Sequence, residues 1–157
     1  MLGDLTPDEI EQLLRRQQLG RLGVTGDGPV YIFPIAYGYD GAFIYGHSQL
    51  GLKVRLMRQH PEVCLEVEEV ESPARWRTVL VHGRYEELWD QASRDEAFAT
   101  IAGQGEPTAP LSLAPYHGPM ETLIVYRIRV TEITGRFEHD EVLRAARDGR
   151  REGEPIG

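Results

Sequence analysis

The sequence predicts a single, mainly β domain: a six-stranded antiparallel barrel with short helices. Three observations support this prediction. A length of 157 residues fits one domain with a real hydrophobic core. About six segments are typical of strands, against three or four that are typical of short helices. Most connections have hairpin length and no strand-helix-strand rhythm repeats, which favours antiparallel pairing.

The N-terminal segment is predicted to begin with a helix. Thr6 stands at a favourable N-cap position, Pro7 follows at the first helical position, and Glu9 lies three residues after the cap. Apolar residues spaced three and four apart give the helix one buried face, and it should run to about Gln18. After Gly20 the pattern changes to β-branched and aromatic residues. These strands are expected around Leu22 and Val24, from Val30 to Tyr39, and from Ala42 to Gly46, the last two joined by the hairpin turn Asp40-Gly41.

The rest of the chain continues as short helices and longer strands. The expected elements are a helix from Leu50 to Gln59, a strand around Val63 to Val67 that is closed by Ser72-Pro73, a long strand from Arg75 to Leu88, a helix from Asp95 to Gln104, a Pro-rich loop from Pro107 to Pro119, a strand from Glu121 to Ile133, and a tail from Asp140 that is helical to Arg147. Two strand segments, Val79 to Val81 and Leu123 to Val125, are apolar on both faces. This pattern indicates a second covering surface, such as another subunit.

Composition and charge exclude several classes of protein. A net charge of -8 disfavours binding to a phosphate backbone, and 41% apolar residues without biased tracts exclude a disordered chain. The single cysteine, Cys64, cannot form an internal disulfide, and the acidic N-terminal segment does not resemble a signal peptide, so a cytoplasmic location is expected. The longest run without charged residues, Pro107 to Met120, contains four prolines and is too short for a spanning helix.

The junction between the Ala42 to Gly46 strand and the following helix is the main candidate binding site. The first turn of this helix, which contains Gly51, exposes backbone N–H groups and the positive end of the helix dipole, Ser48 adds a hydroxyl, and Lys53 adds a full charge. A phosphate is the ligand that these groups favour. A capped surface helix with no ligand is the alternative interpretation of the same residues.

Four segments resemble the FMN-binding split-barrel superfamily that contains the pyridoxamine 5'-phosphate oxidases, and within it the nitroimidazole-resistance (Nim-type) branch. The resemblance covers Gly20 to Leu88 well and the remainder only by strand order. The segments are Pro34 to Tyr39 (PIAYGY), Ile44 to Ser48 (IYGHS) with Gly51 to Lys53 (GLK), His60 to Val67 (HPEVCLEV), and Trp76 to Gly83 (WRTVLVHG).

The resemblance implies a homodimer with two FMN sites at the subunit interface. His47 occupies the place where the Nim-type branch has a histidine beside the flavin, and it is the candidate catalytic residue. The other implied cofactor-binding residues are Pro34, Ile35, Ala36 and Tyr37 along the edge of the flavin ring, Ser48, Gly51 and Lys53 at the phosphate, and Arg77 and Thr78 closing the site.

The implied function is that of a reductase, which passes electrons from NAD(P)H or another donor through FMN to a nitroaromatic or quinone-like acceptor. The alternatives are a non-catalytic flavin-binding or sensing module, and a split barrel that uses haem or a deazaflavin. His47 is either catalytic or a core histidine with a structural hydrogen bond. The five histidines show no metal-ligand spacing, so no metal is expected. The C-terminus lacks the basic segment of the pyridoxamine 5'-phosphate oxidases, which argues against vitamin B6 oxidation.

Overall fold

The computed structural model describes residues 1–105, 119 and 122–140. In that part of the chain, one antiparallel eight-stranded sheet is accompanied by three helices, which confirms the mainly β prediction. The strands are β1 (Leu2–Asp4), β2 (Leu19–Thr25), β3 (Val30–Ala36), β4 (Gly38–Tyr39), β5 (Phe43–Ser48), β6 (Glu62–Ser72), β7 (Arg75–Leu88) and β8 (Ile124–His139), and the helices are α1 (Pro7–Arg16), α2 (Leu52–Gln59) and α3 (Gln91–Ala102). The sheet order is β3-β2-β6-β7-β8-β5-β4, and β1 pairs with β8.

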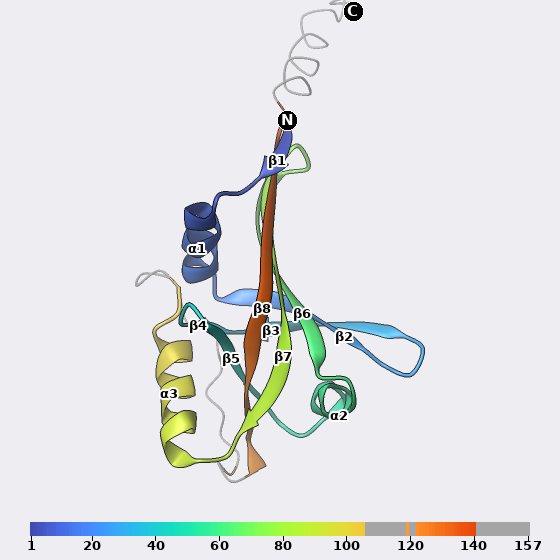
Figure 1. Cartoon of the computed structure of the whole chain (residues 1–157), viewed down its shortest axis with the longest axis vertical. Coiled ribbons are helices and arrows are strands. Elements are labelled where there is room, and N and C mark those ends of the chain that lie inside the picture. The colour runs from blue at the N-terminus through green and yellow to red at the C-terminus, as the bar shows by residue number, and fades with distance from the viewer. Residues whose placement is uncertain (106–118, 120–121, 141–157) are drawn as a thin grey trace, which may run out of the picture.

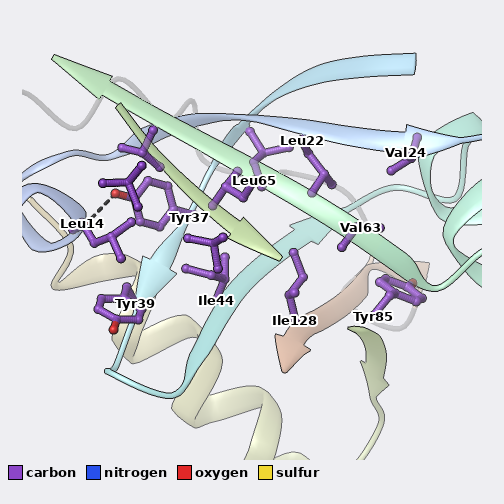
Figure 2. Close-up of a cluster of buried hydrophobic side chains, with 14 of the residues drawn as sticks. Leu14, Leu22, Val24, Tyr37, Tyr39, Ile44, Val63, Leu65, Tyr85 and Ile128 are labelled. Carbon is purple, nitrogen blue, oxygen red and sulfur yellow. Dashed lines mark hydrogen bonds between the residues drawn. The ribbon is translucent and has the colours of Figure 1, made fainter. Parts of the chain in front are cut away.

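The long strands β7 and β8 give the molecule its shape. They run along most of its length and extend beyond the body of the sheet, where β1 joins them, while α1 and α3 lie on one side and α2 closes the opposite lower end (Figure 1). Tyr85 of β7 and Ile128 of β8 face a core that β2, β5 and β6 also line (Figure 2). Val81 of β7 and Ile35 of β3 belong to the same core. A smaller cluster lies between α3 and the other face of β5 and β8.

The C-terminal end of α1 is fixed to the core by buried polar side chains. The hydroxyl of Tyr37 and the Nε2 atom of Gln104 both donate to the carbonyl oxygen of Leu14, each at 2.6 Å (Figure 2 shows the tyrosine bond). The backbone N–H of Tyr39 donates to Oε1 of Gln104 at 3.0 Å. Since free carbonyls at a helix end must find donors, these bonds explain how α1 docks against the turn between β3 and β4.

The expected elements were largely found, with differences that have local causes. The six predicted strands correspond to β2, β3 with β4, β5, β6, β7 and β8, whereas the three-residue β1 was not predicted. The predicted strand from Val30 to Tyr39 is divided at Tyr37, which turns to meet α1. The predicted helix from Asp95 to Gln104 begins earlier, because the Asp90 side chain accepts from the N–H of Ser93 and caps it.

The last strand differs most from its prediction. Instead of ending at Ile133, β8 continues to His139, because its second half pairs with the first half of β7 and with β1. The predicted strand start at Glu121, the predicted loop from Pro107 to Pro119, except Pro119 itself, and the predicted helical tail after Asp140 lie outside the described residues. None of the helices in the described ranges has the length and apolar character needed to cross a membrane.

A buried hydroxyl in the core gives a prediction about stability. Tyr126 is fully buried, its ring centroid lies 5.4 Å from that of Tyr85, and its hydroxyl has no hydrogen-bond partner among the described residues. Since an unsatisfied buried hydroxyl costs free energy, Tyr126→Phe should raise the free energy of unfolding by about 1 kcal/mol in urea denaturation. Tyr85→Phe is the matched control and should lower it by a similar amount, because the Tyr85 hydroxyl donates to Glu87 at 2.9 Å. A Tyr126→Phe protein less stable than the parent would show that the hydroxyl has a partner.

Candidate functional site

The N-terminus of α2 has no side-chain cap, whereas the N-termini of α1 and α3 are capped by side chains. Gly51 occupies its N-cap and provides no side chain, and the first turn contains no acidic residue. By contrast, Thr6 caps α1 in a capping box with Glu9, and Asp90 caps α3. The free N–H groups at the start of α2 therefore remain available to an anionic group.

Lys53 lies in the first turn of this helix and is the only lysine in the chain. Its side chain is half-buried, with Nζ 5.7 Å from the centroid of the Phe33 ring, and burial lowers its pKa. No carboxylate of the described residues forms an ion pair with it, although most of the arginines there are paired. A partly buried cation without a counter-ion is costly, and this cost favours binding of an anion.

His47 lies at the end of β5, shortly before the segment that leads into α2. It pairs with Val125 of β8 and faces α3, where its ring centroid is 5.9 Å from that of Phe98. Burial, and then the positive charge of Lys53, lower the pKa of His47. The unliganded site thus combines a charged amine with an imidazole that favours its neutral form.

The free edge of β3 provides backbone groups. Only β2 pairs with β3 in the described part of the sheet. The N–H of Tyr37 donates to the carbonyl of Gln18 at 3.1 Å, so the ladder is hydrogen-bonded at that position. Hydrogen-bonded and non-hydrogen-bonded pairs alternate along an antiparallel ladder, and the backbone groups of Ala36 and Pro34 therefore point to the free edge. Proline suits this place because it has no N–H to leave unpaired.

Three of the implied site residues have structural contacts instead. Ile35 is a core residue, and Tyr37 is fully buried with its hydroxyl and its N–H both bonded to the segment around α1. Ser48 is half-buried at the end of β5, and its hydroxyl donates to the carbonyl of Gln49 at 2.8 Å. Ser48 still lies beside the open start of α2, whereas Ile35 and Tyr37 position the edge of β3 from within.

Arg77 and Thr78 lie at the other end of the molecule. Thr78 pairs with Arg136 of β8, while His47 pairs with Val125 of the same strand, which separates them by roughly 35 Å along β8. Arg77 lines a hollow of about 360 Å³ in the extended part of the sheet, with Glu9 at 3.9 Å. One chain therefore brings together His47, Ser48, Gly51 and Lys53 but not Arg77 and Thr78.

Sequence reasoning missed the two phenylalanines of the site. Phe33 lies against the Lys53 amine, and Phe98 lies against the His47 ring. Phe33 directly precedes the Pro34 segment, so its position in the sequence could have indicated that it belongs to the candidate site. Phe98 comes from α3, whose approach to β5 has no local signal in the sequence. Among the described residues, no three acidic, histidine or cysteine side chains are grouped in a way that could hold a metal ion.

Comparisons with solved structures show the same fold. An FAD-binding protein from Mesorhizobium loti is 30% identical, with a TM-score of 0.69 over 87% of this chain and 98% of that chain. A proposed 5-nitroimidazole antibiotic resistance protein from Bacteroides thetaiotaomicron is 19% identical, with a TM-score of 0.72 over 87% of each chain. An F420 reductase has 20% identity and a TM-score of 0.58, over 82% of this chain and 98% of that one. These similarities confirm the predicted split barrel.

A curated relative and a family model extend the comparison. An uncharacterised protein of Rhizobium meliloti is 36% identical over 84 residues, which are 54% of this chain and 56% of the relative, so the match spans about half of each. The family model described as pyridoxamine 5'-phosphate oxidase matches residues 6–137, which include every element from α1 to β7 and most of β8. The chain therefore belongs to the pyridoxamine 5'-phosphate oxidase family.

Proposed function

We propose that the protein binds flavin mononucleotide, FMN, in the space between the start of α2 and the free edge of β3. The observation that carries this proposal is Lys53, a half-buried lysine without an acidic partner in the described part of the chain, at a helix start without a side-chain cap. Together they favour a phosphate group. The resemblance to FMN-binding split barrels and the family membership agree with this ligand.

The flavin ring is proposed to lie along the edge of β3. The carbonyl of Pro34 and the N–H of Ala36 face outward there, and an adjacent acceptor and donor can pair with the donor and acceptor of an imide group. Phe33 offers an aromatic surface beside the Lys53 amine. FAD is a second candidate ligand, favoured by the 30% identical structure that is named as FAD-binding.

The complete site is proposed to need two copies of the chain. Arg77 and Thr78 lie too far along β8 from the proposed position of the ligand in their own chain, so they are proposed to complete the site of a partner. The outer face of the sheet has exposed apolar residues that a second copy could cover. On β3, Val30 is 70% exposed and Ile32 is 69% exposed, and on β7, Leu80 is 37% exposed. A homodimer would explain both the exposed apolar face and the distance between Arg77 and the start of α2 in one chain.

The proposed activity is reduction of a small electron-poor acceptor, nitroaromatic or quinone-like, with NAD(P)H as a candidate donor. The flavin supplies the redox chemistry when bound. The chain's own contributions are to hold the phosphate at Lys53, to orient the ring along β3, and to place the imidazole of His47 where it can deliver a proton to the acceptor. The structural neighbours named as a reductase and as a nitroimidazole resistance protein support this activity by fold alone.

Flavin titration and light scattering test the shared site. We expect about one FMN per chain and a particle twice the 17.7 kDa chain mass. Lys53→Ala and Arg77→Ala should each weaken binding when alone. When the two variants are co-expressed, mixed dimers contain one intact site, so tight binding should return in about one site in four. Arg77→Ala should fold normally, because its ion pair with Glu9 is long and exposed.

Each result that contradicts these expectations would exclude a different part of the proposal. A monomer mass in light scattering would exclude the shared site. Unchanged binding by Arg77→Ala would remove this residue from the site while leaving the α2 end intact. Absence of saturable flavin binding by the parent protein would exclude the proposed cofactor altogether.

A further inference from the structure

We propose that a hollow on the outer face of β6 and β7 binds the ribityl chain of the flavin in the partner's site, with Glu66 and Thr78 as hydrogen-bond acceptors. This inference rests on the proposed function, since it adds Glu66 to the shared flavin site and specifies which part of the ligand lies there. The hollow has a volume of about 300 Å³ and is lined by Glu66, Glu68 and Val70 of β6 and by Trp76, Arg77 and Thr78 of β7.

The strand register places Glu66 and Thr78 on one face of the sheet. Thr78 is in register with Glu68, and Glu66 lies two residues before Glu68 on β6, so the three side chains share a face. Val79, which follows Thr78, is fully buried in the core, and this shared face is therefore the outer one. The register partner of Glu66 is Leu80, one of the exposed apolar residues that a second copy is proposed to cover. The hollow is thus continuous with the proposed subunit interface.

One carboxylate oxygen of Glu66 has no hydrogen-bond donor. Its Oε2 accepts from the Thr78 hydroxyl at 3.3 Å, whereas its Oε1 is buried and has no hydrogen-bond partner among the described residues. Arg21 of β2 is bonded to Glu68 at 2.5 Å and remains 3.6 Å from this Oε1, beyond hydrogen-bond distance. Burial, and then the charge of Glu68, raise the pKa of Glu66. Because an unsatisfied buried oxygen costs free energy, the hollow favours a ligand that supplies a donor.

The hydrogen bond between Thr78 and Glu66 restricts the class of ligand further. Since the hydroxyl hydrogen of Thr78 is donated to Glu66, Thr78 can offer a ligand only an acceptor. Arg77 borders the hollow, but its guanidinium is directed to Glu9 of α1, at 3.9 Å. Two acceptors beside a second carboxylate, that of Glu68, repel a phosphate group and favour neutral O–H donors.

The ribityl chain of a flavin has the required chemistry. It is neutral and carries hydroxyl groups, and it joins the ring, proposed to lie along β3, to the phosphate, proposed to lie at Lys53. A partner that contributes Glu66 and Thr78 would therefore contact the ligand between these two ends. This arrangement gives Thr78 a role at the polyol chain and leaves the phosphate to the start of α2.

Riboflavin and lumiflavin separate the polyol chain from the ring, because lumiflavin has a methyl group in place of the ribityl chain. Glu66→Met removes the carboxylate at similar side-chain volume, and Thr78→Val removes the hydroxyl at the same shape. Each variant should weaken riboflavin binding about tenfold in fluorescence titrations and leave lumiflavin binding unchanged. Glu62→Met is the matched control on the same face of β6. The Glu62 side chain is exposed and paired with Arg84 outside the hollow, so this variant should change neither affinity.

The ratio of the two dissociation constants decides the proposal. Equal losses for riboflavin and lumiflavin, or no loss for either, in a variant that remains dimeric would overturn it and leave the flavin site intact. The two variants are judged separately, so that if one failed to dimerise the other would still decide. A parent protein that binds neither flavin would reject the proposed cofactor and this inference with it.

Co-expression shows which subunit Glu66 serves. If Glu66 contacts the partner's ligand, mixed dimers of Lys53→Ala and Glu66→Met chains contain one intact site, and tight FMN binding should return in about one site in four. If Glu66 acts in its own chain, every site of the mixed dimer lacks one of the two residues. Absence of tight sites after co-expression would therefore overturn the proposal.

Discussion

Replacing Lys53 by alanine should weaken FMN binding by about 1.5–3 kcal/mol, or roughly tenfold to more than a hundredfold in dissociation constant. The variant removes the only lysine of the chain, and no described arginine shares its position at the start of α2. A hydrogen bond to a charged group in a partly buried site is worth more than one at the surface, which explains the size of the effect. The loss should be measured by quenching of flavin fluorescence, with riboflavin losing much less than FMN.

The neighbouring Arg55 provides the matched control. It lies on the same helix two residues further along and is exposed, so Arg55→Ala removes a positive charge from α2 without touching the proposed site. The single lysine also allows a direct assay, because an amine-selective reagent can modify only Lys53 and the N-terminus. FMN should protect Lys53 from modification and leave the N-terminus unprotected. If FMN fails to protect Lys53, or if both alanine variants lose equal affinity, the phosphate lies elsewhere.

The parts of the fold that could be predicted from the sequence are those with local chemical signals. The capping residues around Thr6 define the start of α1, and the Asp40-Gly41 turn joins β4 to β5 with Asp40 accepting from two backbone N–H groups. By contrast, β1 is a strand because β8 lies beside it, and its own three residues carry no pattern. The extension of β8 to His139 likewise depends on its partner strands, since Thr134 to Arg136 are not strongly apolar.

The residues of the candidate site likewise include some whose proximity the local sequence predicts and some whose position it does not. His47, Ser48, Gly51 and Lys53 are close in sequence, and a strand that leads directly into a helix must keep them close in space. Arg77 and Thr78 were assigned to the site only by resemblance, and a resemblance gives no positions in space. The structure places these two residues far along β8 from His47, and this separation comes from the register of β7 and β8, which the sequence does not determine.

His47→Ala should lower the rate of nitroaromatic or quinone reduction by about ten- to ten-thousand-fold at saturating flavin, the range of general acid–base catalysis. The ring lies at the end of β5, and burial, with the charge of Lys53, lowers its pKa, so the protonated form that can donate to a bound acceptor is populated mainly on the acidic side of neutrality. As a proton donor, His47 works in its protonated form. The parent rate should therefore fall as pH rises above the His47 pKa in the liganded site, and the variant should lack this dependence.

A purely structural role for His47 predicts a different result. In that case its contact with Phe98 holds α3 against β5, and His47→Ala would lower the unfolding free energy while a folded, flavin-loaded variant kept its turnover. His47→Gln separates the two accounts, because it retains most of the side-chain volume but cannot carry the proton. A slow, stable glutamine variant indicates proton delivery, and a fast one excludes it. His60→Gln, at the far end of α2, is the control for loss of an unrelated histidine and should leave turnover unchanged.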